Sequence, residues 1–489
     1  MKQKRILIWY RNDLRVHDRA AIQEALRAKA EIIPVYCFDD RAFGTTSFGF
    51  PKTGVYRAQF LIESVRDLRN SLKQLGSNLI VRKGLPEKVI SAIAEQLKVD
   101  TVYYQQEVTD EEIKVEKALK KALSAKGIKT KSFWEATLYL LEDLPFSVRE
   151  IPELYTNFRK QVEKRSAIEE ALPTPKQLPP LPEIEIGQIP SLSDLGLEAA
   201  PFDSRAVLKF KGGETEAIAR LKAYFWEADC LKEYKETRNG MLGANYSSKF
   251  SPWLAKGCIS PRYIYEQVQK YESERVKNNS TYWLIFELIW RDFFRFICAK
   301  HGNQIFNVSG LQGIDIPWKE DWDRFNLWRE GKTGYPLVDA NMRELAATGF
   351  MSNRGRQNVA SFLTKNLGIN WKMGAEWFES LLIDYDVCSN WGNWNYTAGV
   401  GNDARGFRYF NIPKQSKDYD PKGEYIKHWL PELASLPGAN AREPWKLNQE
   451  EQKRYGVRLG VNYPRPVVDF FKSLKANEKI YNSAVNSNQ

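Results

Sequence analysis

Two carboxylates and an amide lie close together between Asp384 and Asn390, and these side chains are well suited to chemistry. Asp384 and Asp386 are two residues apart, and Asn390 follows four residues later. Such groups can offer a bound molecule several directed hydrogen bonds, and paired carboxylates can also ligate a hard cation. Helix capping and loop solvation explain the same residue types. The segment taken alone leaves these alternatives open.

A glycine- and serine-rich stretch, residues 234–262, could bind a phosphate group. Ser247, Ser248 and Ser251 offer hydroxyl groups, and Lys249 offers a positive charge. A serine followed by proline, as at Ser251, favours the start of a helix whose free amide groups could hold a phosphate. A capped helix after a loop explains the pattern too, and without further context that interpretation is favoured.

Glu287, Trp290 and Arg291 share one face of a predicted helix, because they are spaced i, i+3 and i+4. They could line a site together. The alternative is an ion pair within the helix, between Glu287 and Arg291, beside a tryptophan of the core. The spacing does not exclude this alternative, which is favoured for each residue taken singly.

The chain has 15 tryptophans, and seven of them concentrate in one stretch of the second half. Large aromatic side chains usually fill a core. Indoles also serve as electron-transfer stations and as platforms on which bases stack. Core packing is the better expectation for any one of them: Trp318, Trp322, Trp328, Trp371, Trp377, Trp391 and Trp394.

The elements that position these side chains follow from the hydrophobic pattern. In residues 1–135, short β-branched or aromatic runs alternate with stretches of helical spacing, which predicts an α/β domain with a doubly wound parallel sheet. The predicted strands are Arg5–Tyr10, Glu31–Phe38, Asn78–Arg82, Thr101–Gln105 and Lys129–Trp134.

Two further regions follow the α/β domain. Residues 136–212 are rich in Pro, Glu and Ser, with too little apolar periodicity for a regular element, and are interpreted as a long interdomain connector. Residues 213–489 show helical spacing almost throughout, which predicts a mostly α-helical second domain. The last 20 or so residues are polar, and we expect them to be frayed.

Composition limits the class of protein. Lys and Arg number 72 against 61 Asp and Glu, a net charge of +11, which favours a polyanionic partner such as nucleic acid. The same excess could serve only solubility. Five scattered cysteines and three histidines predict no metal site and reduced thiols in the cytoplasm. The most apolar stretch, Tyr282–Ile297, contains four charged residues, and no signal peptide is evident, so we expect no membrane contact.

These segments, in this order, make the chain resemble the photolyase and cryptochrome family, and most closely its branch called cryptochrome DASH. The resemblance spans nearly the whole chain, and its colinearity makes it specific. It rests on residues 9–18, Ser247–Pro252, Glu287–Phe293, 330–336, Asn353–Arg356, Asp384–Tyr396 and Tyr425–Leu433.

The resemblance implies FAD, bound in a bent form inside the helical domain. Asp384 and Asp386 would contact the flavin and its sugar chain, and Asn390 would lie against the central ring nitrogen and control its protonation. The remaining matched positions surround the diphosphate region: Tyr234, Ser247, Ser248, Lys249, Phe250 and Ser251, with Glu287, Arg291 and Arg356 nearby.

Two further roles follow from the resemblance. Trp394, Trp371 and Trp318 match the family's electron-transfer chain, in which the indole nearest the flavin donates first. Glu107 matches a residue that contacts an antenna folate in the N-terminal domain, so methenyltetrahydrofolate is a candidate second chromophore.

For DNA, several positions match residues that contact phosphate or a flipped lesion. Two of the positions depart from duplex-repairing members: Tyr396 replaces a tryptophan that walls the lesion pocket, and Gln357 replaces a methionine. A weaker pocket of this kind can still accept a lesion in single-stranded DNA, where no unpairing cost arises. No histidine lies in residues 350–357, which disfavours pyrimidine–pyrimidone photoproducts. The matched residues are Arg238, Glu287, Trp290, Asn353, Arg356 and Gln415.

Three functions remain open at this stage. The first is a monomeric blue-light receptor that binds DNA and influences transcription. The second is a light-driven lyase that splits cyclobutane pyrimidine dimers, mainly in single-stranded DNA. The third is a cofactor-free, tryptophan-rich nucleic-acid-binding protein, which a visible spectrum without flavin bands would support.

Overall fold

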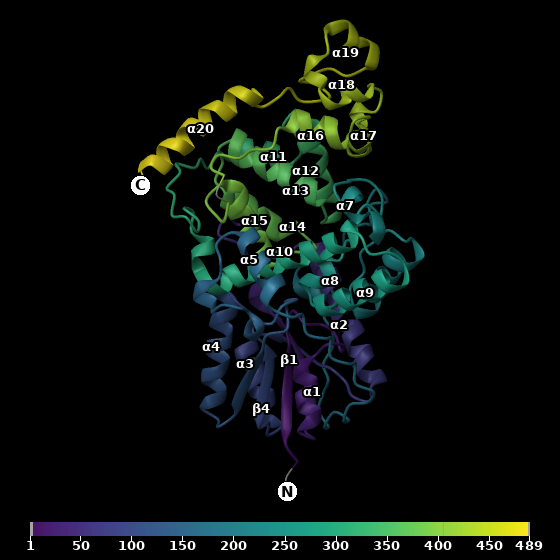
Figure 1. Ribbon diagram of the computed structural model, residues 1–489, viewed down its shortest axis with the longest axis vertical. Helices are drawn as coiled ribbons and strands as arrows, with labels where there is room; N and C mark the ends of the chain where they lie inside the picture. Colours follow the sequence, from purple (N-terminus) through teal and green to yellow (C-terminus); the bar gives the residue numbers. More distant parts are fainter. Residues whose placement is uncertain (1–2, 404, 488–489) are drawn as a thin grey trace.

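A computed structural model of the chain describes residues 3–403 and 405–487. The α/β domain, at the bottom of Figure 1, contains a five-stranded parallel sheet in the order β3-β2-β1-β4-β5. The predicted doubly wound sheet is therefore confirmed. Its strands are β1 (Arg5–Tyr10), β2 (Glu31–Asp39), β3 (Ile80–Gly84), β4 (Thr101–Gln105) and β5 (Lys129–Phe133).

The two faces of the sheet belong to different cores, because successive side chains of a strand point to opposite faces. Leu7 and Ile33 pack on one face, under α3 (Pro86–Gln96) and α4 (Asp110–Ser124). Their neighbours Ile6 and Ile32 pack on the other face, with α1 (Ala20–Arg27) and α2 (Val55–Gln74). This second core continues into the helical domain, which ties the two domains together.

The second domain is mostly α-helical, as predicted, and lies above the sheet in Figure 1. Two π-helical segments, 223–227 and 362–366, continue helices of this domain. Its helices are α6 (Glu214–Lys222), α7 (Tyr234–Thr237), α8 (Ser251–Ala255), α9 (Pro261–Glu274), α10 (Asn279–His301), α11 (Trp322–Arg329), α12 (Pro336–Thr348), α13 (Asn353–Ser361), α14 (Trp371–Leu381), α15 (Val387–Ala398), α16 (Ile412–Tyr419), α17 (Glu424–Trp429), α18 (Gly438–Arg442), α19 (Gln449–Tyr455) and α20 (Phe470–Ser487).

Two expectations about irregular segments were wrong. The connector contains a regular helix, α5 (Tyr155–Arg165), which buries its apolar residues against α10. The polar C-terminal stretch is also helical, because Phe470, Leu474 and Tyr481 of α20 are buried in the core. In both segments a few apolar side chains at helical spacing are enough to stabilise a helix, because a neighbouring element covers them.

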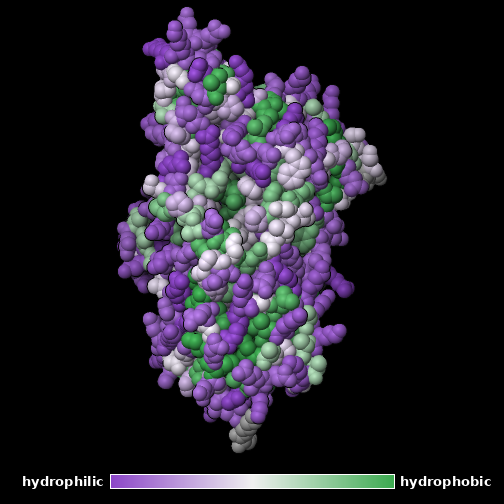
Figure 2. Space-filling view, turned by 180° about the vertical axis from the view of Figure 1, so that it is seen from behind, coloured by the Kyte–Doolittle hydropathy of each residue, from purple (hydrophilic) through white to green (hydrophobic). Residues whose placement is uncertain are grey.

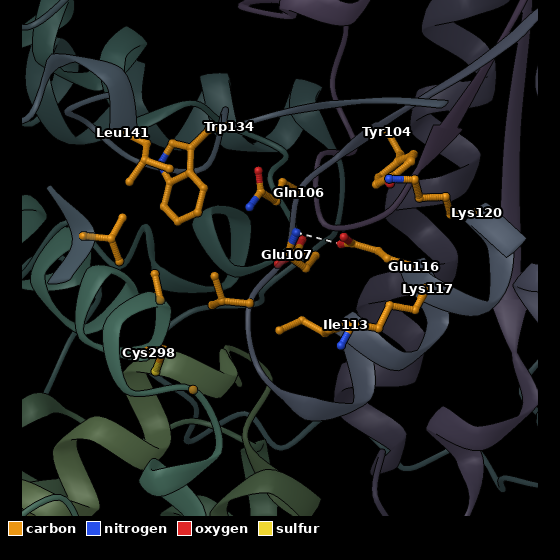
Figure 3. A pocket seen from close by; sticks show the side chains of 14 residues that line it. Tyr104, Gln106, Glu107, Ile113, Glu116, Lys117, Lys120, Trp134, Leu141 and Cys298 are labelled. Carbon is orange, nitrogen blue, oxygen red and sulfur yellow. Dashed lines mark hydrogen bonds between the residues drawn. The ribbon is translucent and has the colours of Figure 1, made fainter. Parts of the chain in front are cut away.

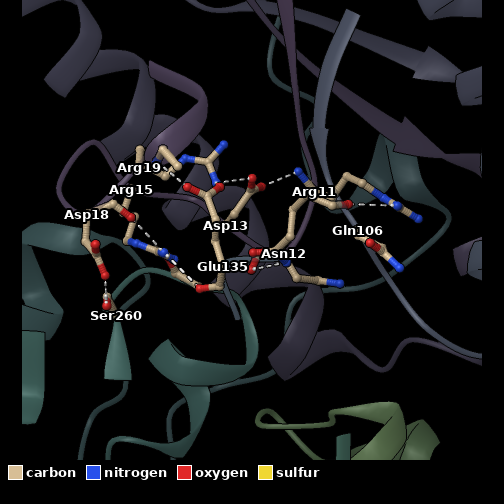
Figure 4. A network of polar contacts seen from close by, with 12 residues as sticks. Arg11, Asn12, Asp13, Arg15, Asp18, Arg19, Gln106, Glu135 and Ser260 are labelled. Atoms are coloured by element: carbon tan, nitrogen blue, oxygen red, sulfur yellow. Dashed lines mark hydrogen bonds and ion pairs between the residues drawn. The ribbon is translucent and has the colours of Figure 1, made fainter. Parts of the chain in front are cut away.

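A cluster of buried charges, the interdomain clasp, joins the domains where the chain leaves β1. The Arg19 guanidinium pairs with Asp13 (2.6 Å) and Glu135 (2.5 Å), as Figure 4 shows. Asp18 pairs with Arg262 of α9 and accepts a hydrogen bond from Ser260. An ion pair therefore connects the α/β domain with the helical domain. The remaining members of the clasp are Arg15, His17 and Glu214.

The surface away from the clasp is mixed. Figure 2 shows that hydrophilic residues cover most of the rear face, while apolar residues gather mainly in its lower half, over the α/β domain.

Among the described residues, no helix is both long enough and apolar enough to cross a membrane, and no cluster of His, Cys, Asp and Glu could hold a metal ion. The proposed domain boundaries after residues 135 and 212 remain predictions.

Candidate functional site

The segment between α14 and α15, residues 382–386, is the centre of the site, and we call it the crossing segment. α14 ends at Leu381, and α15 begins after Asp386, whose carboxylate caps the helix by accepting from the Ser389 amide at 2.7 Å. The capping interpretation is therefore right for Asp386. Tyr385 and Asp386 of the crossing segment line two cavities, one of about 120 Å³ within the helical domain and one of about 710 Å³ between the domains.

Asp384 is held by two partners from other helices. The Arg356 guanidinium of α13 donates to both of its oxygens, at 3.0 and 2.8 Å, and the Ser251 hydroxyl at the start of α8 donates at 2.6 Å. A bidentate arginine fixes the plane of the carboxylate as well as its position. Three segments that lie far apart in the sequence thus converge on one buried carboxylate.

Asn353, Arg356 and Gln357 of α13 face Asn390 and Trp394 of α15 across the smaller cavity. The Asn390 amide donates to the Ala375 carbonyl at 3.0 Å, which fixes the orientation of its carboxamide. Among the described residues, the Gln357 side-chain oxygen is buried without a hydrogen-bond partner. A cavity with an unused acceptor and oriented polar groups fits a planar, hydrogen-bonding group such as a flavin ring.

The tryptophans matched to the electron-transfer chain are largely buried, but they do not form one stack. Trp394 packs on Phe378 with ring centroids 5.0 Å apart, and its indole lies so close to Gly374 that a side chain there would collide with it. Trp371 instead contacts Trp391, with centroids 5.7 Å apart. Sequence reasoning missed Trp391 as an aromatic neighbour of Trp371, although Trp391 lies between Asn390 and Trp394 in the same motif.

The serine loop before α8 is organised by an arginine that sequence reasoning missed. Arg220 of α6 donates to the Ser247 and Ser248 carbonyls, both at 3.0 Å, and to the Ala244 carbonyl at 2.8 Å. α8 begins at Ser251, as the serine–proline pair predicts. Arg220 belongs to no motif in the sequence, because its role depends on a loop that folds back on α6.

Lys249 does not present a charge beside the loop hydroxyls. Its ammonium nitrogen lies 3.1 Å from the centroid of the Tyr246 ring and is buried without a hydrogen-bond partner among the described residues. Burial, aided by Arg220, lowers the pKa of this ammonium to about 6. Contact of Lys249 with a diphosphate stays a prediction, as it does for Phe250 and for Tyr234, both of which are buried.

Glu287 and Arg291 do not pair with each other, so the intrahelical ion pair was wrong. Glu287 pairs with Arg238 at 2.5 Å. The Arg291 guanidinium donates instead to the Ala136 carbonyl and, at 3.2 Å, to the Leu254 carbonyl, and it lines the interdomain cavity. The two side chains of one helix face therefore serve different parts of the site.

Trp290 is backed by a residue from the connector. The ring of Tyr155, in α5, stacks on Trp290 with centroids 3.6 Å apart and planes 9° apart, and Tyr396 meets the same indole edge-on at 5.9 Å. The Tyr396 hydroxyl accepts a hydrogen bond from Arg405. Tyr155 and Arg405 were missed, because nothing in the sequence connects these segments with α10.

Gln415, the last residue matched to DNA contact, lies at the end of a small polar network. Its side-chain oxygen accepts from Arg354 at 3.3 Å and from Asn358 at 3.4 Å. It is therefore linked to the helix, α13, that carries Arg356.

A third cavity, of about 420 Å³, lies between α4 and α10 (Figure 3). The Glu107 carboxylate at its wall accepts from Arg295 at 2.8 Å and from Gln105 at 2.9 Å. Burial by itself raises the pKa of Glu107, but Arg295 and Arg11 bring it below its usual range, so the carboxylate stays charged. The rest of the wall combines apolar residues, such as Trp134 and Leu141, with the charged side chains of Glu116, Lys117 and Lys120, which suits an aromatic ligand that also carries polar groups.

Two family descriptions match the chain: "DNA photolyase" over residues 6–180 and "FAD binding domain of DNA photolyase" over residues 283–483. The chain is 66% identical to a cryptochrome DASH of Gloeobacter violaceus over 484 residues, covering 99% of this chain and 97% of the relative. It is 54% identical to the cryptochrome DASH of Xenopus laevis, covering 95% and 89%.

Solved structures agree with this. A Synechocystis cryptochrome superposes with a TM-score of 0.95 and 58% identity, covering 98% of this chain and 100% of that one. An archaeal photolyase from Sulfolobus tokodaii, described as containing two FAD molecules, superposes with a TM-score of 0.79 and 27% identity, covering 98% and 99%.

Proposed function

The chain belongs to the photolyase and cryptochrome family as an FAD flavoprotein of the cryptochrome DASH type, and from that premise we propose that it absorbs blue light and binds DNA at the mouth of the flavin cavity. The observation that carries this proposal is the convergence of Ser251, Arg356 and Asp384 beside a cavity walled by Asn390 and Trp394. The net charge of +11 supports a polyanionic partner.

The side chains of the cavity divide into two roles. When bound, FAD supplies the absorption of blue light and one-electron exchange. Asp384, fixed by Arg356, would position the group, and Asn390 would hold a hydrogen bond at its ring. Trp394 would donate an electron from the wall of the cavity. Trp371 and Trp318 would then return an electron to the oxidised Trp394.

Photoreduction of bound FAD tests the cavity assignment. We expect Trp394→Phe to slow photoreduction under blue light by about tenfold or more, because phenylalanine is much harder to oxidise than indole. Trp328→Phe is a matched control, since Trp328 is a buried tryptophan that contacts Trp394 edge-on. Unchanged kinetics in Trp394→Phe would refute the donor role.

A second candidate function is light-driven repair of cyclobutane pyrimidine dimers, mainly in single-stranded DNA. It is favoured by Trp290, Glu287 and Asn353, which match positions used in repair, and by the stacked ring of Tyr155, which stiffens the Trp290 platform. Tyr396 and Gln357 offer less apolar contact than the residues they replace, so unpairing a duplex is poorly compensated.

Repair assays on the two substrates separate the candidates. We expect turnover on single-stranded dimers to exceed turnover on duplex dimers by about tenfold or more, since base flipping from a duplex costs a few kcal/mol. Equal turnover would contradict the role given to Tyr396. No turnover on either substrate, together with DNA binding, would leave the photoreceptor function.

The remaining assignments are also proposals. Glu107 and the cavity of Figure 3 would hold methenyltetrahydrofolate as an antenna, with the charged carboxylate as its polar anchor. A cytoplasmic location is supported by five cysteines that are all free thiols. A monomeric state stays a prediction, which sedimentation of the FAD-loaded protein would test.

A further inference from the structure

The first turn of α2, in the α/β domain, abuts the end of α14, just before the crossing segment. The Gly54 amide, which precedes α2, donates to the Ser380 carbonyl at 2.8 Å. The approach is so close that a side chain on Gly54 would lie 2.4 Å from this carbonyl oxygen. The Tyr56 hydroxyl donates to the Ala347 carbonyl at 2.6 Å, so the same turn also holds the end of α12.

Arg57 completes this contact from a fully buried position. Its guanidinium donates to the Glu379 carbonyl and, at 2.8 Å, to the Leu382 carbonyl. It also donates to the Lys52 carbonyl, and it lies over the Tyr385 ring at 5.0 Å from the centroid. Only 3% of the residue is exposed. One side chain therefore contacts the crossing segment at its first residue, Leu382, and again at Tyr385.

The contact has a physical reason. The last carbonyls of a helix lack partners within the helix and carry a partial negative charge, so a cation there is stabilised. The end of α14 has a non-glycine residue, Leu382, in extended backbone at its cap, and the α/β domain supplies the missing donors. Ile383 is anchored from the other side, where its amide donates to the Gly349 carbonyl at 2.8 Å.

We propose that Arg57 is a positioning residue for the flavin, through which the α/β domain sets the geometry of the crossing segment that carries Asp384 and Asp386. This inference rests on the proposed binding of FAD beside Asp384. Arg57 also lines the interdomain cavity, so a ligand there that draws the guanidinium away from the Leu382 carbonyl would disturb the flavin wall.

α2 itself offers a matched control. Arg69 is likewise buried, and its guanidinium also donates to backbone carbonyls: Leu79 at 3.0 Å, Ile186 at 3.2 Å and Gly187 at 2.8 Å. Leu79 directly precedes β3, and Ile186 and Gly187 lie in the connector, so none of the three carbonyls belongs to the crossing segment. Loss of Arg69 removes the same kind of hydrogen bonds without touching the crossing segment.

The test compares Arg57→Met, Arg57→Lys and Arg69→Met in the full-length, FAD-loaded protein. Two quantities are measured: the rate of FAD release, followed by flavin fluorescence on dilution, and hydrogen exchange in peptides that contain residues 382–386. We expect Arg57→Met to raise both by about tenfold, because hydrogen bonds from a charged donor are among the stronger ones. Arg57→Lys should raise both by about threefold, since one ammonium can reach only part of the carbonyl set.

Arg69→Met should lower the unfolding temperature but leave both quantities within about twofold of the wild type. The inference is overturned if Arg57→Met, or Arg57→Lys where the former does not fold, matches the wild type in both quantities. It is equally overturned if Arg69→Met changes them as much. A wild type that retains FAD but neither photoreduces it nor binds DNA would refute the proposed function alone.

Discussion

The interdomain clasp and the interior of the helical domain both bury ionisable side chains, but they treat the charge in opposite ways. In the clasp, Arg19 lies between Asp13 and Glu135, and Asp18 lies against Arg262. Burial by itself raises the pKa of Asp18, but Arg15 and Arg262 bring it below its usual range. The clasp is therefore charged on both sides at neutral pH.

Two ionisable groups of the helical domain, unlike its Arg356–Asp384 pair, are buried without an ion-pair partner. Lys365 donates to the Ala398 carbonyl at 2.7 Å, and burial lowers its pKa to about 7. Glu344 accepts from the Tyr425 hydroxyl at 2.6 Å, and burial raises its pKa to about 8. Without an ion-pair partner, desolvation favours the neutral form, which brings the titration into the neutral range. A change of pH near neutrality should therefore change the charge of these groups in the helical domain and leave the ion pairs of the clasp unchanged.

The largest expected loss of unfolding free energy comes from removing one partner of an ion pair in the clasp. Arg19→Met leaves the Asp13 and Glu135 carboxylates buried without their shared cation, and we expect it to cost about 3–5 kcal/mol of unfolding free energy. Urea unfolding followed by circular dichroism measures this cost. A loss below about 1 kcal/mol would show that water reaches the clasp and that the charges are not truly buried.

A pair of matched substitutions sharpens the comparison. Asp18→Asn removes a charge that Arg262 requires, so we expect a loss of about 3 kcal/mol. Glu344→Gln replaces a carboxyl that is already largely protonated at pH 7, and we expect it to cost less than about 1 kcal/mol. Equal costs in the same unfolding assay would mean that both carboxyl groups are ionised in the native state.

The most gradual effect is a difference in pH dependence at Lys365, spread over about three pH units. Its pKa is about 7 in the native state and near its usual value in the unfolded chain, so between about pH 7 and 10 the unfolded state holds a proton that the native state lacks. Wild-type stability should therefore rise with pH in this window, relative to Lys365→Met, by up to about 1.4 kcal/mol per pH unit. Parallel pH profiles of the two proteins would contradict the lowered pKa.

The segment that contains Lys365 also explains why the C-terminal helix, α20, could not be predicted. This π-helical segment offers the Lys365 and Asn366 carbonyls to the Asn477 amide of α20, each at 2.9 Å, and Tyr481 of α20 donates to the Gly399 carbonyl at 2.9 Å. The helix is stable because of this docking, whereas its own polar sequence favours fraying. The same argument holds for α5, whose Tyr155 finds its partner on α10.

The sequence by itself determined the alternation that builds the parallel sheet, the colinear motifs that identify the family, and the start of α8 at Ser251. These features depend on local periodicity and on residues adjacent in the chain, which a sequence displays directly. Only the tertiary structure decided that Arg57 and Arg220 hold the site, and that Lys249 faces Tyr246. Such roles depend on which distant segments meet and on how deeply they bury a charge, because desolvation and the partner together determine what a side chain does.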